Sequence, residues 1–139
     1  MRIALLDTSV FLRRILGERD AFPFSERFDK VYASELLRVE ALRCLDRLRI
    51  LNRWPQEEIA LRARLLVAAS AFLNFVSLEL PVLRRAAEPF PAVVGTLDAI
   101  HIATALLLQG QLKKPLVFLT HDKKQGLVAQ AAGLETVGF

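Results

Sequence analysis

The sequence contains one cysteine and two histidines. A single thiol excludes an internal disulfide framework, and the helical, apolar surroundings of Cys44 predict a buried residue without a chemical role. Neither of the spacings typical of zinc ligands, CxxC and HExxH, occurs. A disulfide-stabilised fold is therefore excluded, and a zinc site is not indicated.

Long apolar runs are also missing. The longest one, from Leu65 to Leu73, is much shorter than the roughly 20 residues of a membrane-spanning helix. Asp7 interrupts the first apolar stretch of the chain almost at once, which a signal peptide would not show. We therefore expect a cytoplasmic protein with no membrane partner.

What the chain does contain suits one folded domain. Of its 139 residues, 53% are hydrophobic and 24% are charged, which excludes a disordered chain and predicts a real core. We expect a single domain over residues 1–139, because neither a repeat nor a long linker divides the chain. The net charge of +4 and the excess of arginine over lysine favour a polyanionic partner that carries phosphate.

Short apolar segments alternate with helical patterns along the chain. The predicted strands are 2–6, 30–33, 75–78, 116–119 and 135–137. The predicted helices are 8–16, 21–28, 35–51, 56–73, 81–87, 96–109 and 122–133. This alternation predicts an α/β fold of three layers, α/β/α, with a central parallel sheet of four to five strands. Ligands of such sheets bind outside the carboxyl ends of the strands.

Three aspartates stand at marked places in this pattern. Asp7 and Asp122 follow predicted strands, and Asp98 lies at the start of a predicted helix, so a parallel sheet would bring all three toward one edge. Each one also fits a simpler role, because aspartate caps the free N–H groups at helix N-termini. Both interpretations stay open for each residue taken alone.

Glu40 is a fourth acid, and capping does not explain it. It lies on or beside the apolar stripe that Leu37 marks on the predicted helix 35–51. Burying a carboxylate is costly unless the group is paired or binds a metal ion. Glu40 therefore either forms an ion pair with Arg43 or Arg47 or belongs to a functional site.

If the four acids meet, they require a positive charge beside them. Converging carboxylates cannot all stay ionised at neutral pH without one. Ligation by oxygen alone suits Mg²⁺ or Mn²⁺, and these ions polarise phosphoryl oxygens and activate water. A site of this kind predicts phosphate chemistry.

Polar residues flank the acids. Thr8, Ser9 and Thr120 would orient water or a metal ion, or they would complete helix caps. His101 lies one turn after Asp98, where it would shuttle protons, pack in the core or form a hydrogen bond with Asp98.

Four segments, in this order, resemble the PIN-domain family and, within it, the VapC-like toxins of toxin–antitoxin pairs. They are LLDTSV at 5–10, SELLRVEALRCL at 34–45, TLDAIHIATAL at 96–106 and FLTHD at 118–122. Together they run through nearly the whole chain, although residues 49–91 carry no family motif. The resemblance implies a PIN-like fold and a metal-dependent endoribonuclease that hydrolyses RNA phosphodiester bonds, as the toxin of a type II toxin–antitoxin system.

The resemblance also assigns roles to residues. It places the catalytic and metal-binding quartet of the family on Asp7, Glu40, Asp98 and Asp122. The first three would hold the principal Mg²⁺ or Mn²⁺ ion, and the fourth would complete the pocket or help to hold a second ion or the attacking water. A metal-activated water would attack the phosphodiester in line. Contacts to the RNA are expected from Thr8, Ser9, Arg43 and Thr120.

The partners implied by the resemblance are an RNA substrate, a second copy of the chain in a homodimer, and a VapB-like antitoxin. A segment of the antitoxin would lie in an apolar groove. The apolar predicted helices 35–51 and 56–73 would line that groove, or they would form ordinary core. The alternative to a toxin is a non-catalytic RNA-binding or scaffolding α/β domain that keeps the acids for stability.

Overall fold

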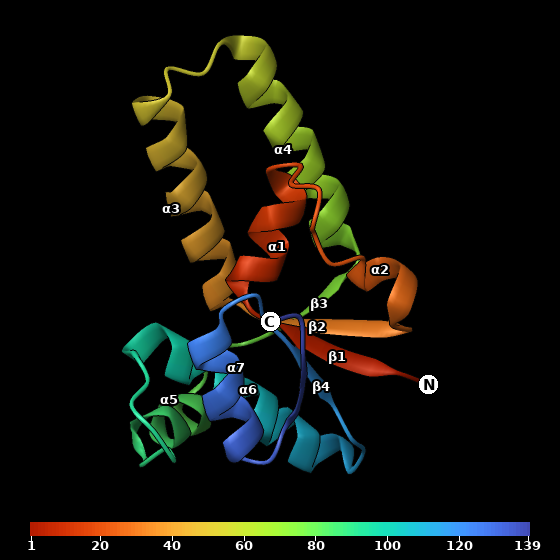
Figure 1. Ribbon diagram of the computed structural model, residues 1–139, viewed down its shortest axis with the longest axis vertical. Helices are drawn as coiled ribbons and strands as arrows, with labels where there is room; N and C mark the ends of the chain where they lie inside the picture. The colour runs from red at the N-terminus through yellow and green to blue at the C-terminus, as the bar shows by residue number, and fades with distance from the viewer.

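The computed structural model describes residues 1–139 and is built on five parallel strands. In chain order they are β1 (Ile3–Leu6), β2 (Lys30–Ser34), β3 (Leu73–Val76), β4 (Val117–Leu119) and β5 (Glu135–Val137). Their order across the sheet is β3-β2-β1-β4-β5, and every neighbouring pair is parallel. Figure 1 shows the strands at the centre of the molecule, with helices above and below them.

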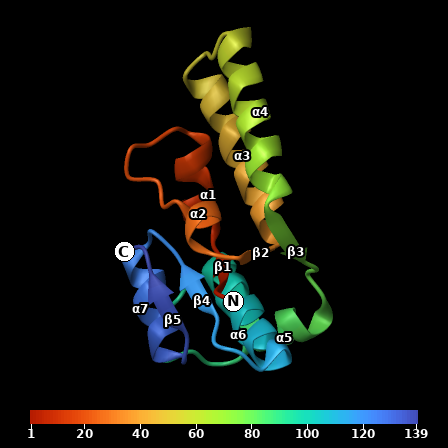
Figure 2. The ribbon, with the colours of Figure 1, turned by 90° about the vertical axis from the view of Figure 1, so that its right-hand side faces the viewer.

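Seven helices flank the sheet. In chain order they are α1 (Thr8–Ile15), α2 (Phe24–Arg27), α3 (Leu36–Leu51), α4 (Gln56–Ala71), α5 (Leu80–Ala87), α6 (Thr96–Leu112) and α7 (Lys123–Ala131). Helices α1 to α4 lie on one side of the sheet and α5 to α7 on the other (Figures 1 and 2). The predicted three-layer α/β/α fold with a parallel sheet is confirmed.

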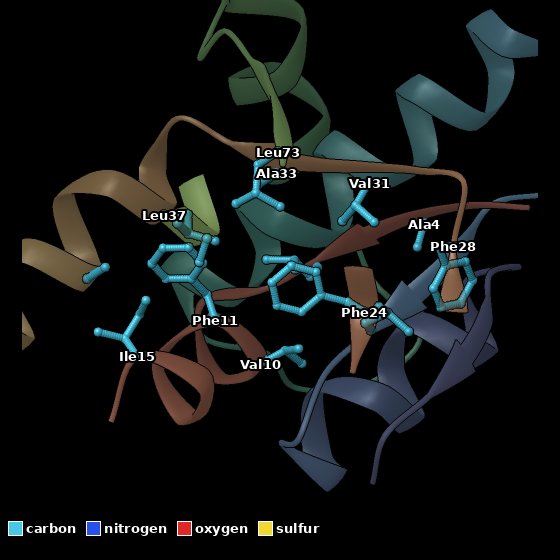
Figure 3. Close-up of a cluster of buried hydrophobic side chains, with 14 of the residues drawn as sticks. Ala4, Val10, Phe11, Ile15, Phe24, Phe28, Val31, Ala33, Leu37 and Leu73 are labelled. Carbon is cyan, nitrogen blue, oxygen red and sulfur yellow. The ribbon is translucent and has the colours of Figure 1, made fainter. Parts of the chain in front are cut away.

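The core is divided by the sheet, because successive side chains of a strand point to opposite faces. In β1, Ala4 and Leu6 join the cluster under α1, whereas Ile3 and Leu5 join the cluster under α6. Figure 3 shows the first cluster, in which Phe11 from α1 packs over the sheet. Strands buried on both faces read as unbroken apolar runs, which is why β1 was visible in the sequence.

Strand β1 lies in the middle of the sheet, between β2 and β4. The chain first builds outward from β1 to β3 and then returns to place β4 and β5 on the other side of β1. In open α/β sheets, ligands bind at such a switch in strand order, outside the carboxyl ends of the strands. Asp7 follows β1 and Thr120 follows β4, so both stand at this position.

Two local predictions differ from the structure on the side of α1. The predicted helix 21–28 is reduced to the single turn of α2, because Pro23 stands directly before it and favours extended backbone in the residue that precedes it. Cys44 was expected to be buried, but it is half-buried and free.

The boundary between α4 and β3 also differs. The helical pattern predicted a helix over 56–73, but α4 ends at Ala71 and the strand begins at Leu73. The parallel register pairs Leu73 with Val31 of β2, so pairing with β2 places Leu73 in the strand and not in the helix. The strand therefore starts two residues before the predicted 75–78.

Helices α3 and α4 form a long hairpin that extends beyond the sheet (Figures 1 and 2). Only Leu37, Ala41 and Ala69 of these helices are buried. The large apolar side chains exposed on the hairpin are Val39, Leu42, Ile50, Leu51, Leu61 and Val67. Most of the hairpin therefore does not serve as core. None of the helices combines the length and the apolar character that crossing a membrane requires.

Candidate active site

Asp7 stands at the junction of β1 and α1 and is 4% exposed. Its Oδ1 atom accepts hydrogen bonds from the Ser9 hydroxyl at 2.6 Å and from the Ser9 N–H at 3.2 Å. Asp7 is thus the N-cap of α1, as one of the two interpretations required. Burial nevertheless raises the pKa of Asp7 to about 6, and the hydrogen bonds from Ser9 only partly offset the lost hydration. A helix cap gains nothing from being buried so deeply.

Asp122 is the N-cap of α7, and its Oδ1 atom accepts a hydrogen bond from the Gln125 N–H at 3.1 Å. Its own N–H donates to the hydroxyl of Thr120, which is fully buried and donates in turn to Oε1 of Gln125 at 2.9 Å. The Ser9 hydroxyl lies 3.5 Å from that of Thr120 and donates to Asp7. Buried hydroxyl groups therefore join the β1–α1 junction to the β4–α7 junction.

Asp98 lies in the first turn of α6, half-buried, and its carboxylate makes no hydrogen bond. It is not the cap of α6, because Gly95 occupies that position. Burial raises the pKa of Asp98, and the negative charges of Asp122 and Glu40 raise it further. The proximity of Asp98 also contributes to the raised pKa of Asp7. All four predicted acids thus act on one another electrostatically through Asp98.

Glu40 of α3 turns toward the interior, and its side chain is 24% exposed. Its Oε1 atom accepts a hydrogen bond from the Thr8 hydroxyl at 2.7 Å and lies 2.5 Å from Nε2 of His101. Burial acts to raise the pKa of Glu40, but the hydrogen bonds from His101 and Thr8 together outweigh it and hold that pKa below its ordinary value. His101, on α6, is 1% exposed. One interpretation of the sequence gave His101 a hydrogen bond with Asp98, but in the structure the partner of His101 is Glu40.

A basic residue does act on the acids, but it is not Arg43. The Arg43 side chain is 72% exposed and pairs with Asp46 at 3.1 Å, so the ion pair with Glu40 does not form. His101 opposes the rise in the pKa of Asp98, and Lys124, in the first turn of α7, opposes it to a smaller extent. A lysine at a helix N-terminus is opposed by the helix dipole, so helix stability does not explain its place.

Two members of this cluster were not predicted. Gln125 is 1% exposed and follows Asp122 by three residues, which is the spacing of a capping box and the signal that could have found it. Lys124 could have been found as a basic residue at the start of a helix. A hollow of about 510 Å³ between α5 and the start of α6 is mostly apolar and contains none of the four acids. The charged groups, and not this hollow, mark the candidate site.

The amino-acid sequence was compared with those of known protein families. Residues 4–131, most of the chain, match the PIN domain. The chain belongs to the PIN-domain family. PIN domains are generally nucleases. A comparison with curated proteins found no match.

Solved structures place this PIN domain among proteins of similar shape. A chain of a toxin–antitoxin complex from Klebsiella pneumoniae superposes with a TM-score of 0.65 at 20% identity, over 96% of this chain and 95% of that one. A chain of VapBC2 from Rickettsia felis, bound to a DNA fragment from the promoter, superposes with a TM-score of 0.66 at 12% identity, over 97% of each chain. At these identities the likeness shows the fold.

PIN-domain nucleases typically use divalent metal ions, and the donor atoms of this site fit one by their chemistry. They are carboxylate oxygens, and a cation would offset both the burial that chiefly raises the pKa values of Asp7 and Asp98 and the repulsion that adds to it. No three acidic, histidine or cysteine side chains of the chain stand at metal-binding spacing. Glu40 is held by Thr8 and His101, whereas Asp98, without a hydrogen bond, is free to turn. The site therefore has the negative charge that a metal ion requires, but the acidic side chains would have to move closer together to bind one.

Proposed function

We propose that this PIN domain is a metal-dependent endoribonuclease, the VapC-like toxin of a toxin–antitoxin pair. The observation that carries the proposal is the electrostatic coupling of carboxylates at the carboxyl ends of β1 and β4. Burial is the main reason that the ionised forms of Asp7 and Asp98 are destabilised, and neighbouring carboxylates add to it: Asp122 and Glu40 at Asp98, and Asp98 at Asp7. Like charges that shift one another's pKa cluster at functional sites. The nuclease character of the family supports hydrolysis of a nucleic acid.

Each acid then has a role. Asp7, Glu40 and Asp98 would hold the principal Mg²⁺ or Mn²⁺ ion. Asp122 would complete the pocket at its exposed rim. The bound ion would polarise a phosphoryl oxygen and acidify a water. Asp98 makes no hydrogen bond in the structure, so its carboxylate is available to the ion.

The residues around the acids would position them or the RNA. Thr8, Ser9 and Thr120 already donate to neighbouring side chains, so we assign them to holding the acids in place. Lys124 stands beside Asp98 and is exposed, which suits a contact to an RNA phosphate. A contact from Arg43 stays a prediction, at a more distant point of the RNA path.

RNA cleavage tests the proposal directly. The purified chain is incubated with total RNA in the presence of Mg²⁺, Mn²⁺ or a chelator, and fragments are quantified. Cleavage is expected with either metal ion, and Asp98→Asn should reduce its rate by about 100-fold or more, because the metal ion loses an anionic ligand. Asp46→Asn is the matched control: Asp46 is also an acid, but it lies on the exposed face of α3 and pairs with Arg43 and Arg49. A chain that binds RNA and cuts none with either ion would contradict the catalytic assignment.

The alternative is a non-catalytic RNA-binding or scaffolding domain, and one observation favours it. Asp7 and Asp122 fill capping roles in the structure, which would be sufficient reason to keep them. Thermal unfolding with added Mn²⁺ separates the two functions. A metal site raises the melting temperature by mass action, whereas helix caps do not respond to the ion.

The α3–α4 hairpin is the surface that we propose for the antitoxin. A hollow of about 320 Å³ lies between the two helices, and most of its lining is apolar. Leu42 and Val67 stand at this hollow and are more than half exposed. A contiguous apolar groove of this kind is typical of a protein-binding site. The structurally similar chains come from complexes of a toxin with an antitoxin, which supports a partner of that kind. The homodimer stays a prediction, which light scattering of the purified chain would check.

A further inference from the structure

The two oxygens of the Glu40 carboxylate have different surroundings. Oε1 accepts a hydrogen bond from the Thr8 hydroxyl at 2.7 Å and contacts Nε2 of His101 at 2.5 Å. The Thr8 hydroxyl and the same His101 nitrogen are 3.2 Å apart, so the three groups form a closed triangle. No hydrogen bond reaches Oε2. One oxygen of Glu40 is therefore held by the protein, and the other is not.

The ring of His101 is placed so that Nε2 carries the hydrogen. Its other nitrogen, Nδ1, is buried and has no hydrogen-bond partner. A buried N–H without an acceptor is costly and rare, so Nδ1 is best left without a hydrogen. Nε2 then donates toward Oε1 of Glu40, as the 2.5 Å contact requires. Core packing on α6 keeps the ring in this orientation, since His101 is 1% exposed.

We propose that His101 is a positioning residue, which with Thr8 holds Glu40 by Oε1 and leaves Oε2 as the single oxygen that ligates a metal ion. The inference rests on the proposed function, in which Glu40 is a metal ligand. Ligating carboxylates are commonly oriented by hydrogen bonds to their other atoms, and loss of such a partner weakens metal binding. His101 comes from the same helix as Asp98, so one element sets the position of two acids.

Calorimetric titration with Mn²⁺ tests this inference without any measurement of activity. His101→Leu removes the donor, and the dissociation constant should rise by about 10- to 100-fold. His101→Gln keeps a side-chain N–H of similar reach and should recover most of the loss. Thr104→Val is the matched control on the same helix: Thr104 is equally buried, but its hydroxyl donates only to the backbone oxygen of Ile100.

Asp7→Asn is titrated in parallel, so that two failures can be told apart. If the wild-type chain binds Mn²⁺, Asp7→Asn does not, and His101→Leu binds as the wild type does, the inference is overturned while the metal site stands. If the wild-type chain itself does not bind Mn²⁺, the proposed function fails and the inference fails with it.

Nitrogen NMR of the wild-type imidazole keeps the inference testable if His101→Leu does not fold. The expected spectrum shows a hydrogen on Nε2 of His101. A ring that carries its hydrogen on Nδ1 alone would overturn the inference, because no donor would then face Glu40.

Discussion

Burying Asp7 costs the folded chain stability at neutral pH. Its pKa of about 6 lies above the ordinary value of 3.8, so between about pH 4 and pH 6 the folded state keeps a proton that the unfolded chain has already released. Stability from this group is therefore fully present below about pH 4 and is lost as the pH rises to about 6. Above that pH the ionised carboxylate costs at most about 3 kcal/mol, since one pKa unit corresponds to 1.36 kcal/mol.

We predict that Asp7→Asn makes the metal-free protein more stable at pH 7, by about 1–3 kcal/mol, because a neutral amide avoids this cost and still caps α1. Urea unfolding of both chains at several pH values measures the effect. The difference should shrink toward zero as the pH falls below about 4, where Asp7 is protonated in both states. A variant less stable than the wild type at pH 7 would show that Asp7 serves the fold and not a site.

Some residues of the candidate site could be predicted from the sequence and others could not. Asp7 directly follows β1 and Asp122 comes three residues after the end of β4, and a parallel sheet places the ends of its strands at one edge. The contact between Glu40 and His101 was out of reach, because it depends on how α3 and α6 meet across the sheet. Helical periodicity predicts which face a residue occupies, but not which side chain of another helix it meets.

Among the helices, those of the α3–α4 hairpin have the fewest buried side chains for their length. Only Leu37 and Ala41 of α3 and Ala69 of α4 are buried. The sequence could not decide between core and groove here. Apolar residues on a helix indicate a covered surface, but they do not show whether the rest of the chain or a partner covers it. Strands β1 and β4 were easier to predict, since burial on both faces produces short, unbroken apolar runs. The predicted boundary between α4 and β3 was wrong, because pairing with β2 overrides the helical preference of the sequence at Leu73.

Charged substitutions in the groove of the hairpin test whether the antitoxin binds there. We predict that Leu42→Glu combined with Val67→Glu abolishes binding of the antitoxin, because the complex would have to bury two unpaired carboxylates. The chain is co-expressed with the product of the adjoining reading frame, and complex formation is measured by size-exclusion chromatography. Melting temperature should change little, since both side chains are more than half exposed.

Leu127→Glu is the control for this experiment. Leu127 is also an exposed leucine, 49% accessible, but it lies on α7, away from the hairpin. It should leave the complex intact. Persistence of the complex in the doubly charged hairpin variant would place the antitoxin on another surface.

The whole molecule combines a positive net charge with a negatively charged site. The chain carries a formal charge of +4, whereas the four acids beside the carboxyl ends of the strands are coupled through the charge of Asp98. An RNA backbone would be repelled by these acids unless cations stand beside them, as a bound metal ion and nearby basic side chains would. Lys124 is the basic residue that the fold brings to this edge, while Lys114 precedes β4 and lies at the opposite edge of the sheet.

We predict that Lys124→Gln weakens RNA binding and that Lys114→Gln does not, although both remove the same charge. Binding of a single-stranded RNA is measured by fluorescence anisotropy at several salt concentrations, in an Asp98→Asn background that slows cleavage. Loss of one phosphate contact should make the slope of log K against log salt shallower by about 0.7, the value for single strands. Equal slopes for the two variants would mean that RNA responds to the net charge of the molecule alone. A shallower slope for Lys124→Gln only would place the RNA backbone across the start of α7, directly over the four acids.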